Sequence, residues 1–129
     1  EIDMRRVVEC AKAAAIHDEI LAMPMGYRSL VGDMGSALSG GQMQRMFLAR
    51  ALYPDPGILI LDEGTANLDP ESERKIVQAL NKLAITQIIV AHRPEAIATA
   101  DRLLMIENGR LIELPPPSKD RRPSIEPSA

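Results

Sequence analysis

Residues 38–42 are Leu-Ser-Gly-Gly-Gln, and residues 58–63 are Ile-Leu-Ile-Leu-Asp-Glu, an apolar run that ends in two acids. A Ser-Gly-Gly turn that opens a helix presents backbone N–H groups and the positive end of the helix dipole to an anion. A buried strand that ends in adjacent acids offers a metal ligand and a general base at the edge of a sheet. These two segments together predict a site that handles phosphate groups.

Two further motifs follow in the chain. Leu68-Asp69 comes shortly after the acids, and Ala91-His92-Arg93 follows a second apolar run at 85–90. The order and spacing of the four segments resemble those of an ATP-binding cassette, with its LSGGQ signature, Walker B strand, D-loop and switch histidine. No Gly-x-x-x-x-Gly-Lys-Ser/Thr sequence occurs in these 129 residues. The resemblance therefore implies a fragment of a P-loop NTPase-like α/β domain, with the Walker B half of the core sheet and without the Walker A half.

Apolar periodicity, helix caps and helix breakers predict the elements. We expect helices at 3–15, 17–23, 40–53, 71–83 and 94–100, and strands at 57–61, 85–90, 102–107 and 110–114. This alternation predicts an α/β layered fold. Asp3 and Ser39 are placed to cap helices, and Asn108-Gly109 predicts a hairpin turn. The first two strands are expected to be buried on both faces. The side chains expected to face the core from helix 40–53 are Phe47, Leu48, Ala51 and Leu52, whereas Arg45 is expected to point elsewhere.

Composition and resemblance together predict the domain organisation. The resemblance covers residues 1–114, with a helical signature subdomain at about 1–53 and a Walker B to switch-histidine core, ending in a hairpin, at about 54–114. Residues 115–129 are rich in proline, serine and charges, which predicts a disordered tail. The net charge of −3 gives no reason to expect a nucleic-acid partner. The single cysteine, Cys10, fits inert packing in a reducing compartment.

The catalytic residues that the resemblance implies are Glu63 and His92. Asp62 would bind Mg²⁺ through water, because Mg²⁺ dehydrates reluctantly and takes few protein carboxylates. Glu63 would orient and deprotonate the water that attacks ATP, and His92 would reach the γ-phosphate and help to arrange that water. Alone, the acids would be solvent-facing residues after a strand and the histidine a strand cap. Beside the signature motif, the catalytic interpretation is favoured.

The resemblance also implies that catalysis is shared between two cassettes. Ser39, Gly40, Gly41 and Gln42 would contact the γ-phosphate of ATP held by the partner cassette, and Asp69 would link the two composite sites. The residues before Leu68 are Ala66-Asn67, where the family usually has Ser-Ala. This departure removes a hydroxyl and leaves the polar role of that position open.

Two features favour an exporter. Arg93 follows the switch histidine, and residues 29–35 are Ser-Leu-Val-Gly-Asp-Met-Gly, which resembles the exporter loop that contacts the coupling helices of the membrane domain. The segment is most similar to that of bacteriocin exporters of the colicin V secretion type. The resemblance therefore implies an ATPase at the cytoplasmic face of the membrane that drives peptide export as a dimer, with an identical chain or a paralogue as its second cassette. The alternatives are a soluble, non-transport cassette ATPase and a remnant that only binds a partner.

Two expectations concern the chain on its own. Without a P-loop it should be inactive and should not bind ATP tightly. The P-loop strand lies in the same sheet as strands 57–61 and 85–90 in the family, so unpaired strand edges should be exposed and should promote self-association.

Overall fold

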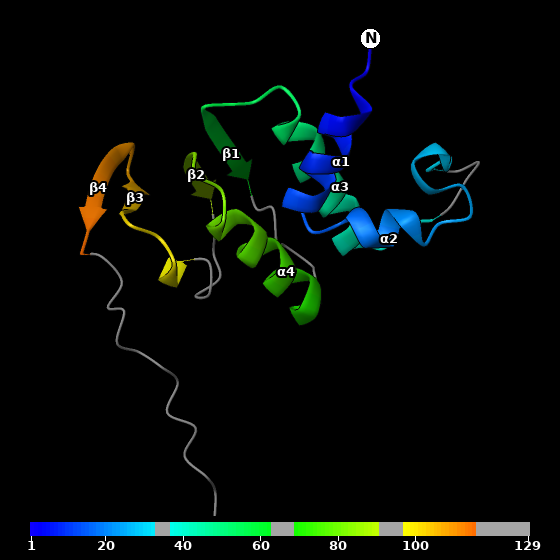
Figure 1. The fold of residues 1–129 in the computed structure, drawn as a ribbon. Helices are drawn as coiled ribbons and strands as arrows, with labels where there is room; N and C mark the ends of the chain where they lie inside the picture. Colours follow the sequence, from blue (N-terminus) through cyan, green and yellow to red (C-terminus); the bar gives the residue numbers. More distant parts are fainter. Residues whose placement is uncertain (33–36, 63–68, 91–96, 116–129) are drawn as a thin grey trace, which may run out of the picture. The chain divides into compact units, whose positions relative to one another are not determined.

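The computed structural model describes residues 1–32, 37–62, 69–90 and 97–115. The chain forms two compact units, Glu1–Val90 and Ala91–Ala129. The first unit holds helices α1 (Met4–Ala13), α2 (His17–Leu21), α3 (Gly40–Leu52) and α4 (Pro70–Asn81), the 3₁₀ helix η1 (Gly26–Arg28), and strands β1 (Ile58–Asp62) and β2 (Thr86–Val90) (Figure 1). The second unit holds strands β3 (Leu103–Glu107) and β4 (Arg110–Leu114). Helices and strands therefore alternate as the sequence predicts.

Strands β1 and β2 form a parallel pair. The register runs from Ile58 opposite Thr86 to Asp62 opposite Val90, and α4 lies between the two strands in the chain. Parallel neighbours need such a crossover connection, because a tight turn cannot bring the chain back to the starting edge. The pairing places the carboxyl ends of both strands at one edge of the sheet.

The core of the first unit is built from small and aliphatic side chains. Helix α1 contributes Cys10 and Ala11, α3 contributes Leu48 and Leu52, and β1 contributes Leu59; the other buried members are Ala14, Ile16, Ile20, Ile76, Ala79 and Leu80. Burial raises the pKa of the Cys10 thiol, which supports the expected inert packing role.

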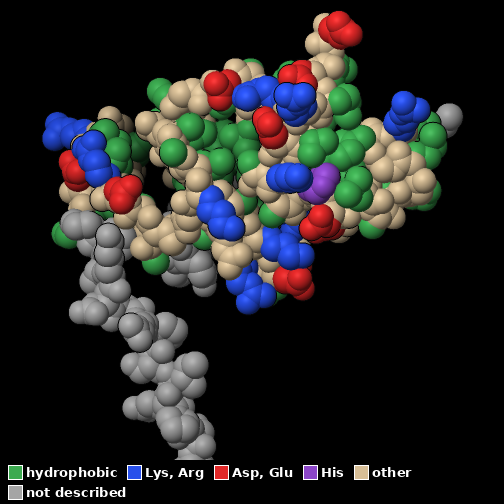
Figure 2. All heavy atoms as spheres, in the orientation of Figure 1, with side chains coloured by type: hydrophobic (Ala, Val, Ile, Leu, Met, Phe, Trp, Pro, Cys, Tyr) green, Lys and Arg blue, Asp and Glu red, His purple; other side chains and the backbone are tan. Residues whose placement is uncertain are grey.

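The expected two-sided burial of the strands is wrong for the residues described. Leu59 is buried in β1, but Ile60 is 68% exposed, and Ile88 in β2 is also exposed. Figure 2 shows hydrophobic side chains at the surface, among charged ones. The physical reason is that the helices of this unit cover the sheet face that carries Leu59, while no described residues of this unit form a layer on the face that carries Ile60.

The expected core face of α3 is also wrong in part. Leu48 and Leu52 are buried as predicted, but Phe47 is 58% exposed, Ala51 is exposed, and Arg45 is only 2% exposed. The buried stripe therefore runs through positions 41, 45, 48 and 52, which is a helical spacing turned towards Arg45. A charged side chain can occupy such a stripe when it is paired, and Arg45 is paired with Glu19.

The helix starts agree with the predicted caps. The side chain of Asp3 accepts hydrogen bonds from the N–H groups of Arg5 and Arg6 at the start of α1. Helix α1 ends at Ala13, earlier than predicted, and Ala15 has a φ of 55°, which no helix can continue through. Ser39 and Asp69 cap α3 and α4.

The second unit contains the predicted hairpin. Strands β3 and β4 are antiparallel, and the turn between them places Asn108 at φ 50° and Gly109 at φ 74°. These left-handed values are those that an Asn-Gly turn adopts between twisted strands. Arg102 donates two hydrogen bonds to the carboxylate of Glu113, at 2.9 and 3.1 Å, beside the hairpin.

Several predictions fall on residues outside the described ranges. They are residues 33–35 of the loop at 29–35, residues 94–96 of the helix at 94–100, and the tail at 116–129. Among the described residues, no helix combines the length and the apolar character that crossing a membrane requires.

Candidate functional site: the signature turn, the end of β1 and the start of α4

The signature turn, residues 39–42, starts α3 with a reciprocal pair of hydrogen bonds. The Oγ of Ser39 accepts from the N–H of Gln42 at 3.2 Å, and the Oε1 of Gln42 accepts from the N–H of Ser39 at 2.9 Å. This capping box satisfies two of the N–H groups that a helix start leaves without partners. The sequence predicted Ser39 as the cap but did not predict that Gln42 would complete it. Gln42 therefore has a structural task within this chain.

The capping box leaves other donors available at the same place. The N–H of Gly40 has no hydrogen-bond partner within the described ranges, and Gly40 is exposed. The hydroxyl of Ser39 accepts one bond but can still donate its own hydrogen. Because the positive end of the α3 dipole lies here as well, the turn is suited to an anion such as phosphate.

Gly41 is buried, in contrast to Gly40. A Cβ at position 41 would collide with the Cβ and Oγ of Ser72 on α4. Glycine is therefore required at 41 for the close approach of α3 and α4. Sequence reasoning assigned this glycine to phosphate and missed Ser72, because a contact between two helices leaves no local pattern in the sequence.

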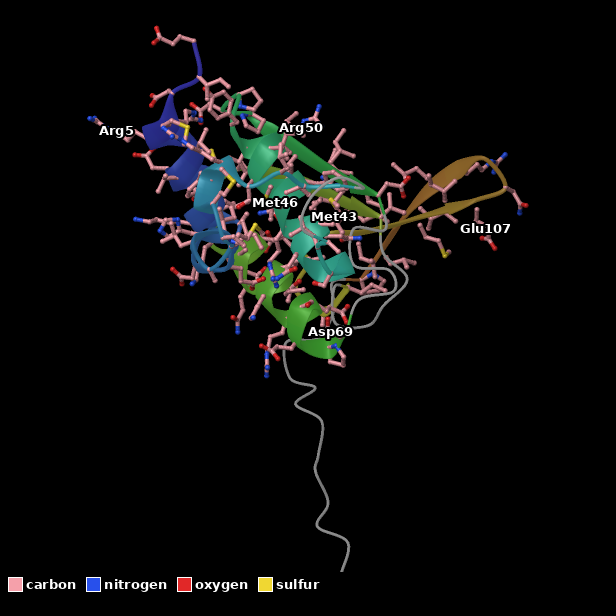
Figure 3. The ribbon with its side chains drawn as sticks, turned by 90° about the vertical axis from the view of Figure 1, so that its right-hand side faces the viewer. Arg5, Met43, Met46, Arg50, Asp69 and Glu107 are labelled. Carbon is pink, nitrogen blue, oxygen red and sulfur yellow. The ribbon has the colours of Figure 1, made fainter. Side chains whose placement is uncertain are left out.

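Asp69 caps α4, with Pro70 at the first helical position. Its Oδ1 accepts from the N–H of Ser72 at 3.0 Å. Hydrogen bonds from Ser72, first from its side chain and then from its backbone, lower the pKa of Asp69. In Figure 3, Asp69 lies nearer to the start of α3, marked by Met43, than to its end, marked by Arg50. The starts of α3 and α4 are thus on the same side of the unit.

Asp62 ends β1 opposite Val90 and is exposed. Its position at the carboxyl end of a parallel strand is where α/β sheets hold their ligands. Within the described part of the chain, no three His, Cys, Asp or Glu side chains gather as metal ligands. A single carboxylate fits Mg²⁺, which usually takes one or two carboxylates and completes its shell with water and phosphate oxygens.

The other predicted site residues, Glu63 and His92, lie outside the described residues, as do Ala66 and Asn67. The structure therefore joins Ser39, Gly41 and Asp69 through the contact of α3 with α4. It describes Asp62 at the end of β1.

A buried ionic contact lies one turn further along α3. Nη2 of Arg45 donates to both carboxylate oxygens of Glu19 on α2, at 2.6 and 2.8 Å. Nζ of Lys75 on α4 lies 3.6 Å from the same carboxylate and 3.1 Å from that of Glu71. Glu19 thus joins three helices. No spacing rule could have predicted this, because the three partners come from separate elements.

The described part of the exporter-like loop at 29–35 carries exposed apolar side chains. Leu30 is 70% exposed, Val31 is exposed, and Met25 beside η1 is exposed too. The hydroxyl of Ser29 accepts from the N–H of Met25 at 3.3 Å, which closes the turn around η1. Exposed apolar side chains of this kind are typical of a surface that another protein covers.

Comparison with known proteins shows which proteins the chain resembles. The family model described as "ABC transporter" matches residues 4–66. The chain is 53% identical over 106 residues to the "Probable microcin-H47 secretion/processing ATP-binding protein" of Escherichia coli, and 52% identical over 106 residues to the "Colicin V secretion/processing ATP-binding protein" of the same species. It is 49% identical over 114 residues to the "ATP-dependent lipid A-core flippase" of Saccharophagus degradans.

These matches cover most of this chain and a small part of each relative. They cover 82% of the chain and 15% of the length of each of the two Escherichia coli proteins, and 87% of the chain and 20% of the flippase. The matched region includes the signature turn and its helix, together with β1. The chain is therefore similar to ABC transporters, and in particular to the ATP-binding part of exporters.

Proposed function

We propose that this chain is the signature and Walker B part of the ATPase of an ABC exporter. The observation that carries the proposal is the start of α3, where the capping box leaves two donors, the hydroxyl of Ser39 and the N–H of the exposed residue Gly40. Those donors suit the terminal phosphate of a nucleotide. In the proposed arrangement, the signature turn of Ser39, Gly40, Gly41 and Gln42 faces ATP held by a second cassette, with Ser39 and Gly40 as its donors, and Asp69 links the two sites.

The same proposal assigns the chemistry to the residues after β1 and β2. Asp62 would hold Mg²⁺, which usually takes only one or two protein carboxylates. Glu63 takes the proton of the attacking water, and His92 orients that water against the γ-phosphate. Mg²⁺ supplies charge stabilisation to the phosphate oxygens when it is bound.

The proposed partners are a second cassette, identical to this one in a homodimer, and a membrane domain. Residues 29–35 would contact its coupling helices, for which the exposed Leu30 and Val31 provide apolar surface. The ATPase would then lie at the cytoplasmic face of the membrane. Because two relatives are named for the secretion of colicin V and microcin-H47, a secreted peptide is the proposed cargo.

Replacing the proposed base tests this function in the transporter that carries the chain. Glu63→Gln should lower ATP turnover by about 10²–10⁴-fold, because the general base is lost while the metal ligand Asp62 remains. ATP should remain trapped between the two cassettes, measured as labelled nucleotide retained after filtration. Asp101→Asn, at an exposed acid of the second unit, is the control and should keep normal turnover. Turnover of Glu63→Gln within about threefold of the parent would exclude Glu63 as the base.

The chain alone should be inactive. Its sequence has no P-loop lysine motif, and the donors at the start of α3 are proposed to serve a nucleotide bound elsewhere. Titration calorimetry of the 129-residue chain with Mg-ATP should therefore show no binding in the micromolar range. A micromolar dissociation constant would contradict the shared-site arrangement.

A further inference from the structure

Ser72 lies against two residues of the proposed site, Asp69 and Gly41. Its N–H donates to Asp69 at 3.0 Å, and its Cβ and Oγ fill the space in which a side chain at Gly41 would lie. Ser72 itself is half-buried in the first turn of α4. We propose that Ser72 is a positioning residue that holds the signature turn against Asp69, so that the starts of α3 and α4 move as one body. This inference rests on the proposed function and deepens it.

The contact between Gly41 and Ser72 is fixed by backbone positions. The Cα of Ser72 lies 3.8 Å from the point where a Cβ of residue 41 would be. A serine hydroxyl can rotate away from a new neighbour, but its Cβ cannot, because the backbone of α4 holds it in place. The distance between the two helices at this turn therefore depends on a glycine that faces a small side chain.

The next turn of α3 and of α4 adds a second contact between the two helices. Arg45, one turn after Gly41, is held by Glu19, and Glu19 also faces Lys75, one turn after Ser72. These two positions share the faces on which Gly41 and Ser72 meet, because residues three and four apart lie on one side of a helix. Two successive turns of α3 and α4 are thus connected, which makes independent tilting of the two helix starts unfavourable.

The inference changes the task of Gly41. If glycine at 41 only allowed phosphate to approach, the identity of residue 72 would not matter to it. If Gly41 acts through Ser72, then a change at 72 that makes room should rescue a change at 41. Second-site rescue therefore separates the two tasks.

The first experiment measures thermal unfolding of the 129-residue chain. Gly41→Ala should lower the melting temperature by about 4 °C or more, although Gly→Ala inside a helix ordinarily stabilises. Ser72→Gly should remove the collision, so adding it to Gly41→Ala should recover most of the loss. Ser72→Ala keeps the Cβ and should recover none of it. Gly57→Ala is the matched control, since no atom lies within 4 Å of its added Cβ.

The second experiment measures ATP hydrolysis by the transporter that carries these variants. Gly41→Ala should lower kcat by about 10²-fold, because a small displacement of a site residue has effects of this size. KM for ATP should stay within about twofold, as expected when an interaction is lost only in the transition state. Adding Ser72→Gly to Gly41→Ala should restore kcat, and adding Ser72→Ala should not.

The outcomes separate this inference from the proposed function. A parent transporter without ATPase activity would contradict the proposed function, while the unfolding data would still test the contact. Rescue of stability without rescue of kcat would overturn the inference, since Gly41 would then be needed at the nucleotide itself. Equal rescue by Ser72→Ala and Ser72→Gly would also overturn it.

Discussion

Arg45 is a cation inside the core of the first unit. Only Nη2 of its guanidinium has a hydrogen-bond partner in the described part of the chain, and that partner is Glu19; its buried Nε and Nη1 have none there. A buried charge is tolerated when it is paired and becomes costly when its partner is removed. The effects of replacing the two residues should therefore differ.

Removing the acid should be more harmful than removing the base. Glu19→Gln leaves the buried guanidinium without its counter-charge and should lower the free energy of unfolding by about 2–3 kcal/mol. Arg45→Met fills the same space with an apolar side chain and leaves Glu19, which is partly exposed, beside Lys75, so it should cost less. Urea unfolding of both variants measures the order. A larger loss for Arg45→Met would show that the pair itself stabilises the fold.

Sequence reasoning at the residue scale succeeded where the relevant partner is close in the chain. Ser39 was predicted as a cap because its partner, the N–H of residue 42, is three positions away. The prediction that Arg45 points away from the core was wrong. Its partner, Glu19, is 26 positions away on another helix, so no local pattern indicates the pair. Ser72 was missed for the same reason. A helix start can be predicted from a few neighbouring residues. The buried contacts of Arg45 and Ser72 cannot, because they depend on which helices pack together.

At the scale of elements, the start of α4 depends on one ionised side chain. Asp69 accepts from the N–H of Ser72, and hydrogen bonds from Ser72 hold the pKa of Asp69 below its ordinary value. A carboxyl whose pKa is lowered by folding stabilises the folded state above its unfolded pKa. That contribution is lost as the pH falls through the folded pKa.

Asp69→Asn should therefore destabilise the chain near neutral pH and have less effect in acid. Asn can still cap the helix but has no charge to interact with the dipole. The difference in unfolding between the parent and this variant should shrink as the pH falls below 3.8, and circular dichroism in urea measures it. Ser39→Ala is the control: its cost of about 1 kcal/mol should not follow this titration, since a hydroxyl does not ionise in this range. A constant difference for Asp69→Asn would contradict the role of the charge.

Element boundaries were predicted better than element faces. The caps of α1 and α3 and the turn of the hairpin lie where the sequence placed them, because each depends on two to four neighbouring residues. The burial of β1 and β2 was overestimated, because the apolar run shows that a face can be buried but not whether a layer lies on it. Glu63 and His92, the two predicted catalytic residues, remain predictions.

At the scale of the whole molecule, the sheet of the first unit has apolar surface on one side. Ile58, Ile60 and Ile88 are exposed, and each of the two strands has a neighbour on only one side among the described residues. Exposed apolar strands with unpaired edges tend to recruit other chains. The surface thus favours contact with further protein, whether a second copy of this chain or another polypeptide segment.

The isolated chain should therefore self-associate. Light scattering should give an apparent mass that rises with concentration, because copies can pair along these strands. Ile60→Lys puts a charge on the exposed face and should reduce the association. Met25→Lys, at an equally exposed apolar residue beside η1, is the matched control and should have little effect. A constant monomer mass of the parent chain at high concentration would contradict the prediction.

The two strand pairs differ in how far apart in the chain their partners lie. The hairpin of β3 and β4 is complete within residues 103–114, whereas β1 cannot pair with β2 until the chain from 62 to 86 has formed a crossover that includes α4. A hairpin closes within about 1–10 μs, and pairing across a longer loop is slower because more chain entropy is lost first. During refolding, the turn at Asn108-Gly109 should therefore form before β1 pairs with β2. A probe in each strand pair would then record two separate rates from one molecule.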